Sequence, residues 1–226
     1  MVKKLKVNRR KALCFTATVS FAAAGILAVI GLLSIRQTKN KSLLLFASMP
    51  FLFALQQLSE GVLWLTIADK QYATISSVTT YLFLVFALVI WPLWVSLSLW
   101  LSERNILRKK LLLLLVGYGF LASIYSTYVL LSCGVSAHII SHGIKYKISW
   151  GNAFQIGYCL FFYMISVIIP FFVSSISFGN IMGTAIALSL VGTYYFMHIN
   201  LLSVWCFFSA ILSILVLFIV QREEQR

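Results

Sequence analysis

Long runs of apolar residues alternate with short polar segments along the chain. A helix needs about 20 apolar residues to cross a membrane. Seven runs reach that length, at 12–35, 42–68, 73–101, 110–134, 152–175, 177–197 and 199–220. The pattern predicts an all-α integral membrane protein, a seven-transmembrane-helix bundle over residues 12–220, with a basic N-terminal extension (1–11) and a cytoplasmic tail (221–226).

The segment between the fourth and fifth runs has a different pattern. Apolar and other residues alternate over 144–148, and Ser141 and Gly143 mark a turn before them. This combination predicts a short outer β-hairpin between helices 4 and 5. His138 and His142 have the spacing of a metal pair on a helix. In a hairpin they lie on either side of the turn, so we expect no metal site there.

Composition excludes an ordinary soluble domain. The chain is 61% hydrophobic and 10% charged, with a mean hydropathy of +0.97, whereas soluble domains are roughly half apolar and a quarter charged. The net charge is +13, but the basic residues lie in the tails and between apolar runs, where they set membrane topology. We therefore expect the lipid bilayer as partner, no nucleic acid and no cofactor.

The number of basic residues is the same for both possible orientations of the chain in the membrane. With the amino terminus inside, nine would be cytoplasmic: Lys3, Lys4, Lys6, Arg9, Arg10, Lys11, Lys70, Lys145 and Lys147. The opposite orientation also places nine there: Arg36, Lys39, Lys41, Arg104, Arg108, Lys109, Lys110, Arg222 and Arg226. The first set depends mainly on one tail, so we predict an outer amino terminus and a cytoplasmic carboxyl terminus.

Three stretches carry a family resemblance: Cys14–Phe21, Gln56–Trp64 and Val204–Phe208. They resemble an uncharacterised family of bacterial multi-pass membrane proteins, whose members open on a Cys-Phe-Ser-Ala-Thr-Ala-Ser-Phe motif and carry Gln-Gln-x-x-Glu-Gly-x-x-Trp in the second helix. The resemblance covers most of the chain. It implies a seven-helix fold in the bacterial inner (plasma) membrane, but no activity.

The chain departs from this family at its amino terminus. It has Thr16 and Val19 where Ser and Ala are usual, and the basic extension precedes the motif. Our hypothesis is that the extension is dispensable, or that translation starts at Leu13. Mass spectrometry of the mature amino terminus tests this, since abundant intact 1–11 peptides would contradict a start at Leu13.

Glu60 is the unusual residue of the second apolar run. An ionisable group at membrane depth costs about 2.5 kcal/mol or more and is a functional-site candidate by default. Gln56, Gln57 and Trp64 precede or follow it by three or four residues, so all four share one helix face. Two readings remain open: a packed polar knot between helices, or a site for a proton, a cation or a ligand.

Four further residues are expected near Glu60, because each falls in the outer half of the bundle in the predicted orientation: Cys14, His198, Trp205 and Cys206. The four cysteines of the chain also include Cys133 and Cys159. Free buried thiols in helix packing, disulfides on the outer side and metal ligation are the alternatives for them. No catalytic or metal-binding residue is predicted.

Prolines and glycines predict local shape. Pro92 frees the carbonyl of Leu88, and Pro170 frees that of Ser166, because proline lacks an N–H donor. Gly179 and Gly183 form a small-residue stripe suited to close helix packing. We interpret all of these as bundle shaping.

The function that these residues favour is a small-solute or proton carrier, or a sensor, with an outer-half cavity centred on Glu60. The alternative is a non-catalytic membrane interaction or assembly factor. A membrane-embedded metal-dependent hydrolase is a second alternative, disfavoured because His and Asp ligands are missing from the helices. The seventh run has no lysine for a retinal Schiff base. We therefore lean against an enzyme.

Overall fold

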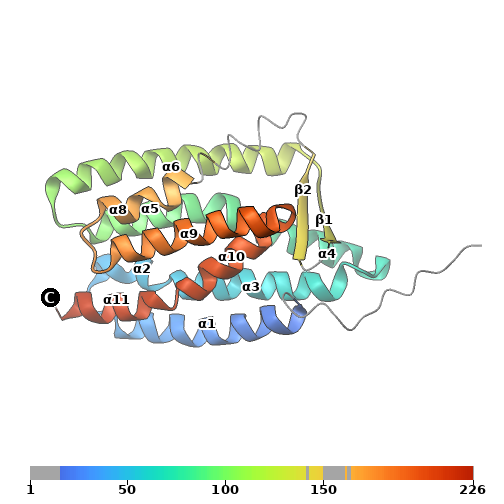
Figure 1. The fold of residues 1–226 in the computed structure, drawn as a ribbon, viewed down its shortest axis with the longest axis horizontal. Coiled ribbons are helices and arrows are strands. Elements are labelled where there is room, and N and C mark those ends of the chain that lie inside the picture. The colour runs from blue at the N-terminus through green and yellow to red at the C-terminus, as the bar shows by residue number, and fades with distance from the viewer. Residues whose placement is uncertain (1–15, 141–142, 150–160, 162–163, 226) are drawn as a thin grey trace, which may run out of the picture.

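A computed structural model describes residues 16–140, 143–149, 161 and 164–225. Its helices run along one long axis, and a two-stranded hairpin lies across one end of them (Figure 1). The carboxyl-terminal helix ends at the opposite end. We call these two ends the hairpin end and the basic end.

The elements follow the apolar runs of the sequence. The first half contains α1 (Ala17–Gln37), η1 (Lys41–Leu43), α2 (Leu44–Ala47), α3 (Met49–Thr66), η2 (Lys70–Tyr72), α4 (Ala73–Leu84), η3 (Val85–Ile90), α5 (Trp91–Ser102) and α6 (Ile106–Ser132). The second half contains β1 (Val135–Ile140), β2 (Gly143–Ile148), α8 (Ile169–Val173), α9 (Gly179–Met197), η4 (His198–Asn200), α10 (Leu201–Leu212) and α11 (Leu215–Glu224).

Six helical segments of the described residues are long and apolar enough to cross a membrane. They are Ala17–Gln37, Lys41–Thr66, Lys70–Ser102, Ile106–Ser132, Gly179–Met197 and Leu201–Glu224. Each overlaps one predicted run. Of the fifth run, 152–175, the structure describes a shorter apolar helix, Met164–Val173, since most of the preceding residues lie outside the described part.

Two of the predicted helices are interrupted. The run at 42–68 breaks at Ser48, whose hydroxyl donates to the carbonyl of Leu45, and α3 then begins with Pro50 in its first turn. The run at 73–101 contains the wider π-helical turn of η3 just before Pro92. Proline removes one helical hydrogen bond, and π-turns are a common way to absorb such an interruption.

Hydroxyl groups of neighbouring helices bind carbonyls beside both prolines. Ser123 of α6 donates to the carbonyl of Val89 at 2.6 Å, and Ser96 of α5 donates to the carbonyl of Ser166 at 2.8 Å. Pro170 was predicted to free that second carbonyl. In an apolar medium such carbonyls need a partner, so these bonds fix how the helices pack around each proline.

The predicted hairpin is present. Strands β1 and β2 pair antiparallel, with Val135 opposite Ile148 and Ile140 opposite Gly143. The amide of Asn200, in η4, donates to the carbonyl of Ile140 at 2.8 Å. The ring of Tyr146 in β2 stacks on Phe83 of α4, with centroids 4.5 Å apart. The hairpin is therefore packed onto the bundle and covers that end of α4 and α10.

Glycines permit the closest helix contacts. A Cβ on Gly31 of α1 would overlap the backbone of Phe51 in α3, and one on Gly119 of α6 would overlap the backbone of Pro92 in α5. Gly183 of α9 packs against Phe171 of α8, where a Cβ would lie 2.9 Å from the Phe171 Cβ. The stripe predicted at 179–183 thus serves helix packing.

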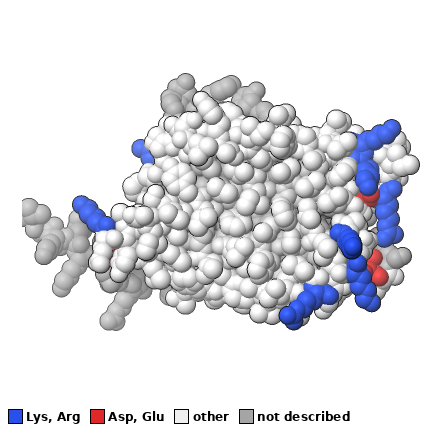
Figure 2. Space-filling model, turned by 180° about the vertical axis from the view of Figure 1, so that it is seen from behind, with Lys and Arg blue, Asp and Glu red and all other residues white. Residues whose placement is uncertain are grey.

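Charged side chains gather at the basic end, as Figure 2 shows. This end collects the last turns of α1 and α11, segment η1, and the junction between α5 and α6. Its described cations are Arg36, Lys39, Lys41, Arg104, Arg108, Lys109, Lys110 and Arg222. The described cations of the loops toward the hairpin end are Lys70, Lys145 and Lys147.

Candidate functional site

The inner face of α3 carries the polar residues that the sequence singles out. At 100° per residue, Gln56, Glu60, Trp64 and Gln57 fall within an arc of about 100°. Gln56 and Gln57 are fully buried, Glu60 is 2% exposed, and Trp64 is partly buried. Helical periodicity therefore brings these four residues to one face, and that face is directed into the bundle.

Glu60 is bound to a second helix through one hydrogen bond. The hydroxyl of Ser203 in α10 donates to its Oε1 at 2.5 Å, and Ser203 is itself buried. Among the described residues, Ser203 is the only hydrogen-bond partner of Glu60, and no described lysine or arginine pairs with it. A buried carboxyl group normally has several partners or a counter-ion, so this one is sparsely held.

Gln56 connects the same layer to a third helix. The indole nitrogen of Trp91 in α5 donates to the Gln56 Oε1 at 2.7 Å. The Trp91 ring also stacks on Phe53, with centroids 3.8 Å apart. Cys206, one turn after Ser203 on α10, lies close enough to both Gln56 and Glu60 to interact with them. Helices α3, α5 and α10 therefore meet in a single buried polar layer.

Several polar atoms of this layer have no hydrogen-bond partner within the described part of the chain. Among the described residues, both side-chain atoms of Gln57, the indole nitrogen of Trp64 and the hydroxyl of Tyr146 are buried without a hydrogen bond. Buried polar groups almost always bind something, either protein or water. These atoms therefore have unused hydrogen-bonding capacity on the residues around Glu60.

Tyr146 brings the hairpin to the Glu60 layer. Burial raises the pKa of Tyr146 well above its ordinary value, and the nearby Glu60 and Cys206 raise it further. The phenol therefore keeps its proton and stays a hydrogen-bond donor near Glu60. Because its ring also stacks on Phe83, Tyr146 forms part of the cover over the polar layer on the hairpin side.

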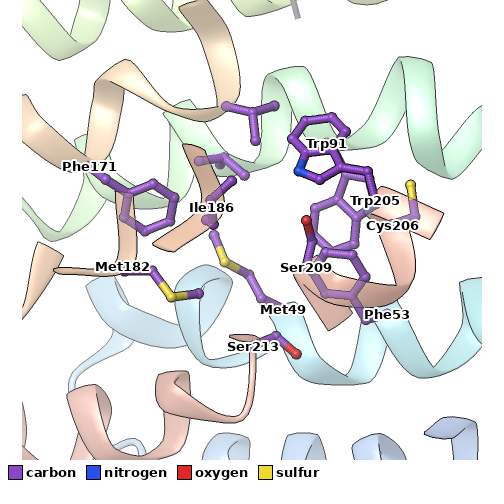
Figure 3. A pocket seen from close by; sticks show the side chains of 12 residues that line it. Met49, Phe53, Trp91, Phe171, Met182, Ile186, Trp205, Cys206, Ser209 and Ser213 are labelled. Carbon is purple, nitrogen blue, oxygen red and sulfur yellow. The ribbon is translucent and has the colours of Figure 1, made fainter. Parts of the chain in front are cut away.

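A cavity of about 30 Å³ lies next to the polar layer (Figure 3). One water molecule needs at least about 10–15 Å³ by this measure, so the cavity has room for about two. Its lining is Met49, Phe53, Trp91, Val95, Val167, Phe171, Met182, Ile186, Trp205, Cys206, Ser209 and Ser213.

The cavity lies on the basic side of Glu60. Its lining includes Met49 in the first turn of α3, Met182 in the first turn of α9 and Ser213 just after α10, and these positions are toward the basic end (Figure 1). Of the predicted site residues, Trp205 and Cys206 line it. Glu60 and the other polar residues of α3 are not among its lining residues, so this cavity is not the outer-half cavity centred on Glu60 that the sequence predicted.

The remaining predicted residues have separate outcomes. Cys14 lies outside the described residues, as does the side chain of His198, whose backbone belongs to η4. Cys133 and Cys206 are free thiols, whereas Cys159 lies outside the described residues. In the described part of the chain, no three His, Cys, Asp or Glu side chains are grouped closely enough to hold a metal ion.

Three residues of the site do not stand out in the sequence: Ser203, Trp91 and Tyr146. Serine, tryptophan and tyrosine are ordinary members of apolar helices and hairpins, so their types alone carry no signal. Ser203 lies 143 positions from Glu60 in the chain. Ser203 and Ser209 both lie three residues from Cys206, so helical spacing alone does not single out Ser203.

A second buried carboxylate, Glu103, was also not predicted. It is 2% exposed and accepts hydrogen bonds from the backbone of Arg104 and Asn105 and from both the backbone and hydroxyl of Ser175. Burial raises the pKa of Glu103, but these hydrogen bonds outweigh it, so the pKa lies below its ordinary value. Glu103 therefore joins the α5–α6 junction to the segment before α9.

Comparison with known proteins gives a family whose function is unknown. A family model described as a family of unknown function (DUF6629) matches residues 13–226. No curated protein matches the chain significantly, and neither does any solved structure. The predicted resemblance to an uncharacterised family is thereby confirmed over nearly the whole chain.

Proposed function

Since the chain belongs to DUF6629, a family of unknown function, we propose a function from its own residues: a membrane carrier or sensor in which Glu60 reversibly binds a proton or a small cation. The observation that carries this proposal is a carboxyl group that is 2% exposed and has one described hydrogen-bond partner, Ser203. Carboxyl groups are costly at membrane depth and mark ion or proton sites when they persist there.

The surroundings of Glu60 support exchange of a bound ion. No described residue binds the amide oxygen or the amide nitrogen of Gln57, the indole N–H of Trp64 or the hydroxyl of Tyr146. An oxygen of Gln57 and the second oxygen of Glu60 are suitable ligands for a small hard cation. The donors suit water molecules that accompany a proton or cation. The residues thus provide partners for either form of the carboxyl group.

Access to Glu60 is proposed from the basic end. Cys206 is near Glu60 and also lines the cavity, together with Ser209 and Ser213 further along the chain. Spacings of three and four residues place these three side chains on one helical face. The hairpin and Tyr146 cover the other side. The proposed route therefore passes along α10, from Glu60 toward the basic end.

The proposed orientation places the basic end in the cytoplasm. Eight described lysines and arginines belong to that end and three to the loops near the hairpin. Cytoplasmic loops of membrane proteins carry the excess of Lys and Arg. In this arrangement, Glu60 exchanges its ion with the cytoplasmic side, and the hairpin lies outside the membrane.

Proton or cation uptake into liposomes tests this function. We expect Glu60→Gln to reduce pH-driven or cation-driven uptake by at least about tenfold, because the neutral amide cannot alternate between charged and uncharged forms. Ser203→Ala is the matched control for the hydrogen bond and should leave uptake present with a changed pH profile. Wild-type uptake no greater than that of empty liposomes, with no pH-dependent tryptophan fluorescence, would contradict the proposal.

The hydrogen bonds of the layer favour a second candidate function. Two hydrogen bonds link α3 to α5 and α10: the one from Trp91 to Gln56 and the one from Ser203 to Glu60. A rigid interaction or assembly factor would require such links. In that case Glu60→Gln leaves fluorescence, uptake and ion dependence unchanged, because glutamine can still accept from Ser203. The same variant therefore separates the two functions.

A further inference from the structure

The carboxylates of the basic end are turned into the protein. Glu224 accepts hydrogen bonds from the backbone of Lys39 and Asn40, at 3.0 and 2.9 Å. Glu223 accepts from the backbone of Ser177 at 2.7 Å. Glu103 likewise accepts hydrogen bonds from the backbone N–H groups of Asn105 and Ser175. All three acids thus hold loop backbone in place.

The cations of the same end are turned outward. Seven are exposed and Lys109 is partly buried: Arg36, Lys39, Lys41, Arg104, Arg108, Lys109, Lys110 and Arg222. Figure 2 shows this basic rim along one end of the molecule, with little red visible among the blue. Because the three acids are bound to backbone N–H groups, the charged side chains that face outward at this rim are mainly positive.

The basic rim adjoins exposed apolar surface. In α6, Arg108 and Lys110 lie among Ile106, Leu107 and Leu114, which are 72%, 73% and 71% exposed. Two rim cations also lie over aromatic rings: Lys109 is 5.4 Å from the Trp100 ring centroid, and Arg222 is 5.2 Å from that of Phe178. Cations with apolar and aromatic neighbours of this kind are typical of the bilayer interface.

We propose that the basic rim binds the phosphate headgroups of anionic phospholipids. Their acyl chains would cover the exposed apolar residues of α6, and their phosphates would lie beside Arg108, Lys110 and the neighbouring cations. Juxtamembrane clusters of four to eight basic residues attract anionic lipid in this way. Nucleic acid has the charge but offers nothing to cover the apolar surface. The inference rests on the membrane location and is independent of Glu60.

Thermal unfolding of the full chain in neutral detergent tests this inference. Three proteins are compared: wild type, a basic-rim variant (K39Q/R108Q/K110Q) and a matched hairpin-end variant (K70Q/K145Q/K147Q). Each is titrated with phosphatidylglycerol, with phosphatidylcholine, with soluble glycerol phosphate and with an RNA oligonucleotide. A ligand that binds the native state raises the unfolding midpoint. The backbone bond of Lys39 to Glu224 survives the substitution.

We expect phosphatidylglycerol to raise the midpoint of the wild type and the hairpin-end variant, and the rim variant to need roughly tenfold more of it. Equal shifts with phosphatidylcholine, equal responses of the two variants, or the same shift with glycerol phosphate or an RNA oligonucleotide would overturn the proposal. Should the rim variant fail to fold, salt supplies the second measurement. Screening by 1 M salt, where the Debye length is about 3 Å, should then weaken the wild-type response.

Discussion

Two carboxyl groups of this protein have the same exposed fraction and are bound differently. Glu103 and Glu60 are each 2% exposed. Glu103 accepts four hydrogen bonds at the basic end, whereas Glu60 accepts one from the part of the chain that the structure describes, donated by Ser203. The exposed fraction alone therefore does not separate these two acids. We expect the number of partners to separate them, because a fully bonded carboxylate is held in one state, whereas a sparsely bonded one is free to exchange a proton or an ion as we propose for Glu60.

The largest expected effect is on the structural side of this comparison. Glu103→Ala removes the acceptor for three backbone N–H groups and one hydroxyl. Each buried donor left without a partner costs about 1–3 kcal/mol, so unfolding free energy should fall by about 3 kcal/mol or more. Denaturant or thermal unfolding in detergent measures it. Asp69→Ala, which removes a single bond to the Gln71 backbone, is the control and should cost much less.

The second effect concerns the Glu60 layer. Trp91→Phe keeps the stacking on Phe53 but leaves the Oε1 of Gln56 without its donor. We expect a loss of about 1–2 kcal/mol in unfolding free energy. Trp94→Phe is the control, since its indole donates at 3.1 Å to the carbonyl of Leu45 in a partly buried site. A larger loss at Trp94 would contradict the importance of the layer.

We expect low pH to destabilise the folded protein through protonation of Glu103. Its pKa is lowered in the folded protein from an ordinary value of 4.5. A lowered pKa contributes stability above the unfolded value, and that contribution disappears as pH falls through the folded pKa. The thermal unfolding midpoint of the wild type should therefore fall as the pH is lowered past about 4.5. This fall should be smaller in Glu103→Gln. An unchanged pH profile in the variant would show that Glu103 is not the group responsible.

The smallest expected change in stability is at the other carboxyl. Glu60→Gln keeps an acceptor for Ser203 and removes an ionisable group from the buried polar layer, so unfolding free energy should change by about 1 kcal/mol or less. The same unfolding experiment measures it beside Glu103→Ala. If Glu60→Gln proves the more destabilising of the two, Glu60 is a structural acid and the comparison is reversed.

The sequence predicted the parts of this fold that depend on local pattern. Apolar length identified the helical runs, alternation identified the hairpin, and a lone carboxylate in an apolar run singled out Glu60. Pro170 pointed to the Ser166 carbonyl that Ser96 binds. These signals are local because membrane helices must satisfy their own backbone.

The contacts between distant segments were not predictable in the same way. Trp91 is 35 positions from Gln56, and Ser203 is further still from Glu60, so only the packing of α3, α5 and α10 brings them together. Glu103 resembled an ordinary loop charge, because its bonds to Ser175 join segments 72 positions apart. Residue type suggests where chemistry is possible, and tertiary packing decides which residues take part.

Infrared difference spectroscopy tests the central claim most directly, because it observes the Glu60 carboxyl group itself. Spectra of the reconstituted protein are recorded as pH or cation concentration is stepped, for wild type and for Glu60→Gln. We predict a C=O band of a buried carboxylic acid that gains or loses intensity with the step and is missing from the variant. A wild-type spectrum that does not change with pH or cation, or a changing band that persists in Glu60→Gln, would contradict the claim that Glu60 binds and releases an ion.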